Sequence, residues 1–220
     1  VNYALHEDIA FTPASNFNGF GNIVSGAYLA NFDGMNHTID GLKLSNFFTI
    51  TDQTYAGLFR EIKSTKDSPQ EIKNLKLTNA NFTPIIATAG DPITAGLLIG
   101  HAINSSAAPI VISNININDS NLILNNSAPS TLGNLGIAGG LIGLIDSPTN
   151  LGSLSLNNIA LKNTNIEASH MAGGLIGNVA NNNMTLGTLL LDNVSVKAAF
   201  EHDLAGNFND TYAGGLFAVT

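Results

Sequence analysis

Apolar and polar residues alternate in a short segment that recurs four times along the chain. The copies share an asparagine at their third position, and they are Ile72–Leu77, Ile112–Ile117, Leu156–Leu161 and Leu191–Val196. A side-chain period of two predicts a β-strand with one buried face. We expect the recurring asparagines to face away from the core or to lie at bends, and these are Asn74, Asn114, Asn158 and Asn193.

A glycine-rich phrase lies between these segments and recurs five times, for example as Ile137-Ala-Gly-Gly-Leu-Ile-Gly143. Its alanines are residues 56, 95, 138, 172 and 213, so successive copies are 39, 43, 34 and 41 residues apart. Each copy is expected to form a strand that follows a polar turn. Its glycines either take left-handed corners or let neighbouring layers approach closely. They are Gly57, Gly96, Gly100, Gly139, Gly140, Gly143, Gly173, Gly174, Gly177, Gly214 and Gly215.

The two patterns together predict an all-β fold of stacked repeats. Periods between 20 and 50 residues are typical of solenoids, propellers and arrays. A propeller would need four strands in each repeat and usually carries aromatic signatures, whereas this chain has no Trp and four Tyr. We therefore predict a parallel β-helix in which each repeat of about 40 residues supplies roughly two rungs. Asparagines stacked at its turns are expected to form amide ladders.

The repeats predict a single unit over residues 1–220, with a lead-in strand at 1–16 and about five repeats over 17–220. The last copy of the phrase breaks off within a repeat, at Thr220. We therefore expect the chain to be an internal piece of a longer protein, with targeting and anchoring signals elsewhere.

Composition narrows the range of partners. The chain has 8 Lys and Arg against 16 Asp and Glu, a formal net charge of −8, and its basic residues are scattered singly. No basic stripe is available for phosphates, so nucleic acid is not an expected partner. No apolar stretch is long enough to span a membrane, so direct insertion by this segment is not expected. The absence of cysteine excludes disulfides and thiolate metal sites.

Candidate chemical residues are few. The five histidines, at positions 6, 37, 101, 170 and 202, lack the spacing of a zinc motif, and we predict neither a metal site nor a cofactor. Asp33 and Asp52 are 19 residues apart, close to one predicted rung, and could form the carboxylate pair of a polysaccharide-cleaving enzyme. Because no aromatic platform or arginine clamp accompanies them, we expect no enzyme activity, with such a hydrolase or lyase as the alternative.

Stretches that vary in length between repeats are the expected contact regions. They are 64–71, 87–92, 125–131 and 201–210. Insertions in repeat proteins project from one side and often bind partners, although solvated loops without a partner remain an alternative. The candidate contact residues are Asp67, Glu71, Asp91, Asn125, Asn126, Glu201, His202 and Asp203.

The glycine phrase resembles the GLUG motif, a glycine-leucine-any-glycine repeat of large bacterial surface proteins. These include some immunoglobulin A peptidases and filamentous-haemagglutinin-like adhesins. The copies Gly140–Gly143 and Gly174–Gly177 match the motif, whereas Arg60 replaces its final glycine in the first copy. The stretch Asn31–Leu42 looks like the lead-in that commonly precedes such repeats. The resemblance covers about residues 17–220.

This resemblance implies a right-handed parallel β-helix in an exported bacterial protein, often an autotransporter passenger or a two-partner-secreted adhesin. The catalytic apparatus of the peptidases lies outside their GLUG arrays, so it implies no catalytic residue here. We expect a non-catalytic virulence-associated segment, at the bacterial cell surface or secreted, that attaches to a host-cell glycan or protein or to another copy of itself. The alternative is a stalk that only spaces a distant functional domain.

Overall fold

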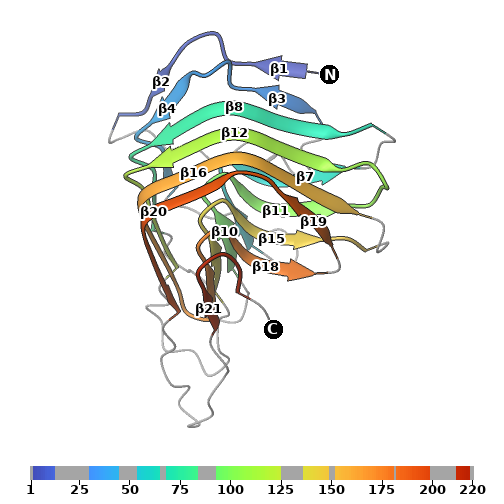
Figure 1. The fold of residues 1–220 in the computed structure, drawn as a ribbon. Helices are drawn as coiled ribbons and strands as arrows, with labels where there is room; N and C mark the ends of the chain where they lie inside the picture. Colours follow the sequence, from blue (N-terminus) through green and yellow to red (C-terminus); the bar gives the residue numbers. More distant parts are fainter. Residues whose placement is uncertain are drawn as a thin grey trace.

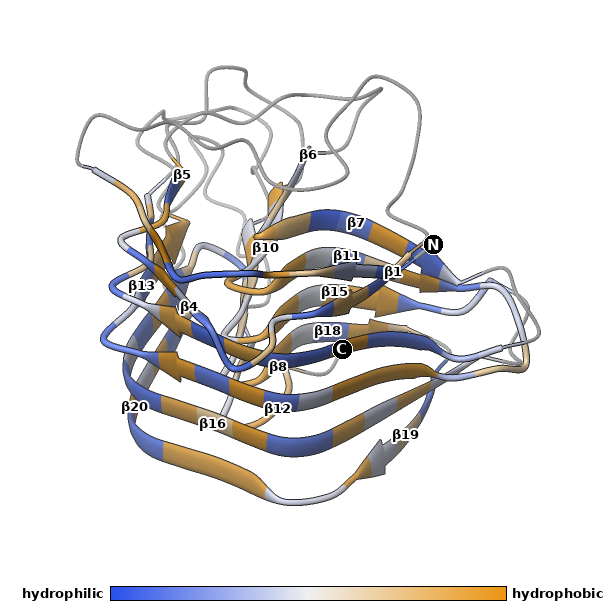
Figure 2. Ribbon diagram, turned by 90° about the horizontal axis from the view of Figure 1, so that it is seen from above, coloured by the Kyte–Doolittle hydropathy of each residue, from blue (hydrophilic) through white to orange (hydrophobic). Residues whose placement is uncertain are grey.

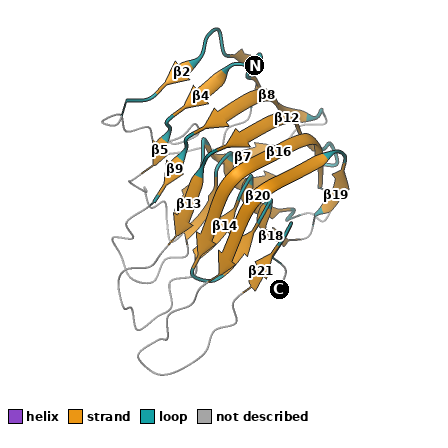
Figure 3. Ribbon diagram, turned by 60° about the vertical axis from the view of Figure 1, so that its left-hand side comes forward, coloured by secondary structure: helices purple, strands orange, loops and turns teal. Residues whose placement is uncertain are grey.

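The computed structural model describes residues 2–12, 30–44, 54–64, 68–83, 93–124, 136–148, 152–180, 182–198 and 212–218. Within these ranges the chain forms strands and turns, with no helix, and every strand pair is parallel (Figure 3). The predicted all-β class with parallel strands is confirmed.

The strands form three sheets, whose arrangement is shown in Figure 1. Sheet 1 contains twelve strands: β1 (Asn2–Ala4), β2 (Ile9–Ala10), β3 (Asn31–Asp33), β4 (Thr38–Asp40), β5 (Lys43–Leu44), β8 (Gln70–Thr78), β9 (Asn81–Phe82), β12 (Ile110–Asn118), β13 (Asn121–Leu124), β16 (Ser153–Ala168), β19 (Asn183–Leu186) and β20 (Leu189–Ala198). Sheet 2 contains β6 (Thr54–Ala56), β10 (Ile93–Gly96), β14 (Gly136–Gly139), β17 (Met171–Gly173) and β21 (Tyr212–Gly214). Sheet 3 contains β7 (Phe59–Ser64), β11 (Ile99–Asn104), β15 (Ile142–Asp146) and β18 (Ile176–Ala180).

The chain passes through the three sheets in a fixed order, and we call one such passage a circuit. A circuit runs from β8 and β9 in sheet 1 to β10 in sheet 2, then to β11 in sheet 3, and returns to sheet 1 at β12. The described strand pairs join residues from 29 positions apart, Asn2 with Asn31, to 44 positions apart, Ile110 with Leu154. The expectation of two rungs in each repeat is therefore wrong, because the two recurring segments lie on different sides of one circuit.

The fourth alternating segment joins sheet 1 in a register that the sequence did not predict. Ile112 pairs with Leu156, as the repeat predicts, whereas Leu191 pairs with Leu161. Asn193 therefore does not continue the column of the other three recurring asparagines. The register changes because β20 pairs with residues only 30 positions earlier, so the last passage through sheet 1 is shorter.

Asparagines form the bends of sheet 1. The four recurring ones have φ between 54° and 57°, the left-handed region that asparagine tolerates better than most residues. They also form the predicted amide ladders. The Asn114 Nδ2 donates to Asn74 Oδ1 at 2.8 Å, and the Asn158 Nδ2 donates to Asn114 Oδ1 at 2.9 Å. A second ladder joins Asn193 Nδ2 to Asn163 Oδ1 at 2.9 Å.

The glycine phrase forms the corner between sheets 2 and 3, and not one continuous strand as predicted. In the third copy β14 ends at Gly139 and β15 begins at Ile142. Close approach explains these glycines apart from Gly215, since Gly41 is the only glycine of the described part with a positive φ. A Cβ on Gly143 would lie 2.6 Å from the backbone oxygen of Gly100 in the preceding circuit. Only glycine lets the circuits pack this closely at the corner.

Inward side chains of neighbouring circuits stack into apolar columns. In one column of sheet 1, Phe32, Ile72, Ile112 and Leu156 follow one another as paired residues and are at most 4% exposed. Apolar and polar positions alternate along the same strands, as Figure 2 shows. The core therefore continues from one circuit to the next, which is the arrangement that a repeated side-chain pattern favours.

Candidate functional site

The connections from sheet 1 to sheet 2 begin at equivalent points of successive circuits. Ala168, at the end of β16, pairs with both Leu124 at the end of β13 and Ala198 at the end of β20. From the ends of β5, β9, β13, β16 and β20 to the next strand of sheet 2, the chain takes nine, ten, eleven, two and thirteen residues respectively. Four of the five connections are therefore long. They begin on the same side of sheet 1, at the C-terminal ends of its strands.

The short connection consists of Ser169 and His170, which bind the circuit before them. The Gly136 N–H donates to Ser169 Oγ at 2.9 Å, and the His170 N–H donates to the Gly136 carbonyl oxygen at 3.1 Å. Two residues are thus enough to join sheet 1 to sheet 2. The other four connections are longer than this one by seven to eleven residues.

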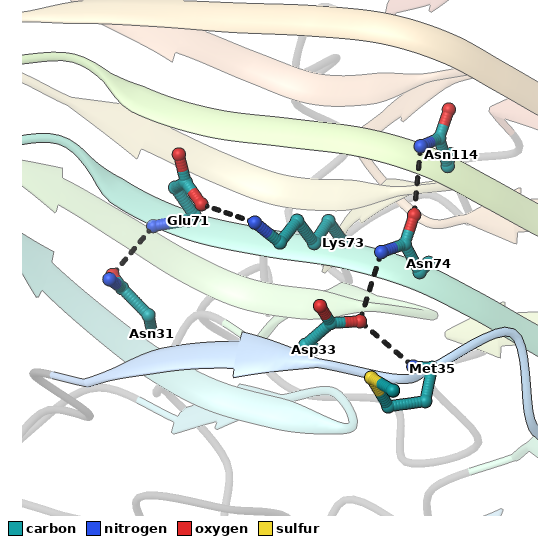
Figure 4. A network of polar contacts seen from close by, with 7 residues as sticks. All are labelled: Asn31, Asp33, Met35, Glu71, Lys73, Asn74 and Asn114. Atoms are coloured by element: carbon teal, nitrogen blue, oxygen red, sulfur yellow. Dashed lines mark hydrogen bonds and ion pairs between the residues drawn. The ribbon is translucent and has the colours of Figure 1, made fainter. Parts of the chain in front are cut away.

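Most of the predicted contact residues fall in segments that the structure does not describe. Outside the described residues lie Asp67, Asp91, Asn125, Asn126, Glu201, His202 and Asp203. Glu71 is different, because it lies within β8 and not in a loop. Its carboxylate pairs with Lys73 Nζ at 2.7 Å, and its backbone N–H donates to Asn31 Oδ1 at 2.9 Å (Figure 4).

Asp33 begins the first asparagine ladder (Figure 4). Its Oδ1 accepts hydrogen bonds from Asn74 Nδ2 and from the Met35 N–H, both at 2.9 Å. Burial raises the pKa of Asp33. These two hydrogen bonds and the charge of Lys73 lower the pKa by more than burial raises it, so the net shift is downward. A carboxyl group held as the anion in this way is a structural acceptor and a poor general acid.

The proposed pairing of Asp33 with Asp52 has no support from the register. A separation of 19 residues does not correspond to one circuit, and the paired neighbours of Asp33 are Ala4 and Lys73. Asp52 lies outside the described residues. The expectation that this pair stacks depended on two rungs in each repeat, and the paired neighbours of Asp33 contradict it.

A second polar cluster lies at the corner of sheets 2 and 3, and sequence reasoning missed it. The rings of Tyr55 and His101 stack with centroids 4.5 Å apart, and His101 Nδ1 lies 3.4 Å from Glu61 Oε2. The hydrogen bond with His101 lowers the pKa of Glu61 more than burial raises it. Burial, together with the charges of Glu61 and Asp146, raises the pKa of Tyr55 to about 12. Tyr55 therefore stays a neutral phenol near neutral pH.

The only sequence signal for this cluster was Arg60, which replaces the final glycine of the phrase. Arg60 is 3% exposed, and burial lowers the pKa of its guanidinium. The equivalent Gly100 has no space for a Cβ, because the backbones of Arg60 and Ala56 lie within 2.8 Å of that position. Arg60 escapes this restriction because β7 is the first described strand of sheet 3.

The remaining histidines show no metal-binding arrangement within the described ranges. His37 Nδ1 lies 3.1 Å from Asp8 Oδ1, which also accepts a hydrogen bond from the Thr38 N–H at 2.7 Å. Among the described residues no group of three or more His, Cys, Asp or Glu side chains is placed to hold a metal ion. His202 lies outside the described residues.

Comparison with known protein families, curated proteins and solved structures found no match to this chain. The part of the chain that the structure describes contains no helix long and apolar enough to cross a membrane.

Proposed function

We propose that this chain is a segment of a right-handed parallel β-helix in a bacterial surface-displayed or secreted adhesin. In this proposal the segment is not catalytic. It presents the long connections between sheet 1 and sheet 2 to a host-cell glycan or protein. The chain order through the three sheets and the stacked asparagines support the β-helix, and the resemblance of the glycine phrase to GLUG repeats supports the bacterial surface.

One observation carries the binding role. Four connections of nine to thirteen residues begin at the C-terminal ends of sheet 1 strands. Ser169 and His170 make the equivalent connection with two residues. Ordering a longer segment costs conformational entropy. Extra length that recurs at one edge of a repeat protein is typical of a contact surface. A stalk that only spaces a distant domain would not need it.

The last long connection, residues 199–211, offers a direct test. Ala198 pairs with Ala168, and Tyr212 pairs with Met171, so the gap that this connection spans is equivalent to the gap that two residues span one circuit earlier. Replacing residues 199–211 by Ser-His should therefore preserve the fold. Asp192→Asn, an exposed change on the adjacent strand, is the control.

The fluorescently labelled chain is tested for saturable binding to mammalian cells, matrix proteins and glycans, with an unrelated β-helix as the reference. We expect the shortened variant to bind at least about tenfold more weakly while its melting temperature stays close to that of the parent, and Asp192→Asn to bind normally. Binding by the parent chain no greater than the reference, or full binding by the shortened variant, would contradict this contact surface; the former favours a stalk.

A further inference from the structure

A column of side chains stacks along the first bend of sheet 1 and begins at Asp33. Each asparagine of this column donates its Nδ2 to the Oδ1 one circuit earlier, from Asn158 to Asn114 at 2.9 Å and from Asn114 to Asn74 at 2.8 Å. Asn74 donates in the same way to Asp33 at 2.9 Å (Figure 4). An inner member of the column therefore needs both an acceptor and a donor. Aspartate fits only the first place, because a carboxylate accepts hydrogen bonds and donates none.

The second bend of sheet 1 carries an equivalent column, but this one has an aspartate in its middle. Its members in successive circuits are Asp40, Asn79, Asp119, Asn163 and Asn193. Asn79 Nδ2 donates to Asp40 Oδ1 at 2.7 Å. Asn163 Nδ2 donates to Asp119 Oδ1 at 2.9 Å, and Asn193 donates to Asn163. Among the described residues no hydrogen bond joins the side chains of Asp119 and Asn79, so the column is broken there.

Two oxygen atoms face each other at this break. The backbone does not cause it, since φ is 53° at Asn79, 51° at Asp119 and 48° at Asn163. Asn79 uses its Nδ2 for Asp40, so its Oδ1 is directed toward the next circuit. Asp119 uses its Oδ1 for Asn163, so its Oδ2 is directed toward Asn79. Every other link of the column has an N–H opposite an oxygen, whereas this one has no hydrogen to share.

We propose that a proton on Asp119 closes this break and links the two circuits in acid. A protonated carboxyl group has a donor and an acceptor, as the amide of asparagine does. Its O–H can donate to Asn79 Oδ1 while its other oxygen keeps the bond from Asn163. Asp40 responds to acid in the opposite way, because it lies first in the column and only accepts hydrogen bonds from side chains. The place of an aspartate in the column therefore decides whether a proton breaks a link or makes one.

Other charged groups near Asp119 are few. The preceding bend, residues 78–80, has no titratable side chain, and the last charged residue of β8 is Lys76. The following bend contributes Lys162, whose Nζ lies 4.0 Å from Asp192 Oδ2, and both of these side chains are exposed. Salt at about 0.3 M screens such surface charges, whereas it leaves a direct hydrogen bond in place. Measurements in this salt therefore isolate the proposed link.

Thermal unfolding of the full chain at this salt concentration tests the link. Asp119→Asn supplies the missing N–H at every pH, so it should raise the melting temperature by about 1–6 °C at pH 7. The gain should shrink as pH is lowered toward about 3, because aspartates then take up protons and the parent closes the break itself. Asn114→Asp creates the same break in the first column. It should lower the melting temperature at pH 7, and this loss should also shrink in acid.

Glu7→Gln is the control, because it removes an exposed negative charge outside both columns. Its melting temperature should equal that of the parent at each pH. If Asp119→Asn is no more stable than this control at pH 7, no hydrogen bond is missing and the proposal is wrong. The gain is compared at pH 7 and at the lowest pH at which the parent keeps its native circular dichroism. An equal gain at both also overturns the proposal, because the proton then does not replace the missing N–H.

Discussion

The close approach of circuits at the glycine corner predicts a difference between two alanine substitutions. Gly140 and Gly215 take the same place in the phrase, since Gly139 and Gly214 both align with Gly173 in sheet 2. A Cβ on Gly140 would lie 2.3 Å from the Gly174 backbone oxygen. A Cβ on Gly215 would meet no atom within 4 Å, because no described circuit follows it. Gly215→Ala is thus a matched control for Gly140→Ala.

The expected magnitudes follow from two opposing effects. Overpacking of a buried site costs about 1–3 kcal/mol, and at Gly140 the obstacle includes a backbone oxygen that cannot rotate away. Replacing glycine by alanine also restricts the unfolded chain, which stabilises by about 0.4–1 kcal/mol. Gly140→Ala should therefore lower the free energy of unfolding by about 1–2 kcal/mol, and Gly140→Val, with its branched Cβ, by more. Gly215→Ala should be neutral or stabilise by up to about 1 kcal/mol.

Thermal unfolding followed by circular dichroism measures this difference. For a chain of this size 1 kcal/mol corresponds to about 2–4 °C in melting temperature, so Gly140→Ala should melt about 2–8 °C below the parent. Gly215→Ala should melt at the parent temperature or slightly above it. Equal melting temperatures for the two variants would refute the argument that close approach of successive circuits selects glycine here.

Two further predictions concern the bends of sheet 1. Asn114→Ala removes both ladder hydrogen bonds and places alanine at a φ of 55°, so urea unfolding should show a loss of about 2 kcal/mol. Asn114→Gly should lose about half as much, because glycine accepts this φ, and equal losses would show that the backbone conformation contributes nothing. Hydrogen bonds from Thr78 and Asn79 lower the pKa of Asp40, so the folded state holds its proton less readily than the unfolded state. The stability that Asp40 contributes is therefore present above about pH 4 and is lost as pH falls through its folded pKa. Asp40→Asn should flatten this part of the pH–stability profile, and an unchanged profile would contradict the role given to these hydrogen bonds.

The positions of the long connections were predictable from the sequence, but the point at which they leave sheet 1 was not. Variation in length between repeats indicated the long connections. The structure places their starting points at the C-terminal ends of the sheet 1 strands. The cluster of Tyr55, Glu61 and His101 was not predictable, because 40 residues separate His101 from Glu61. The recurring glycine phrase indicates that the strands after it are equivalent, but the expectation of two rungs in each repeat did not place Glu61 and His101 on adjacent strands.

Local patterns in the sequence determined the alternating strands and the asparagine bends, because these depend on side-chain period and on which residues tolerate a left-handed backbone. The tertiary structure alone decided that one repeat makes one circuit and that Leu191 pairs with Leu161 and not with Leu156. Similar strands offer several registers of nearly equal local quality. The choice among them depends on the length of the intervening chain and on which inward side chains then continue the core.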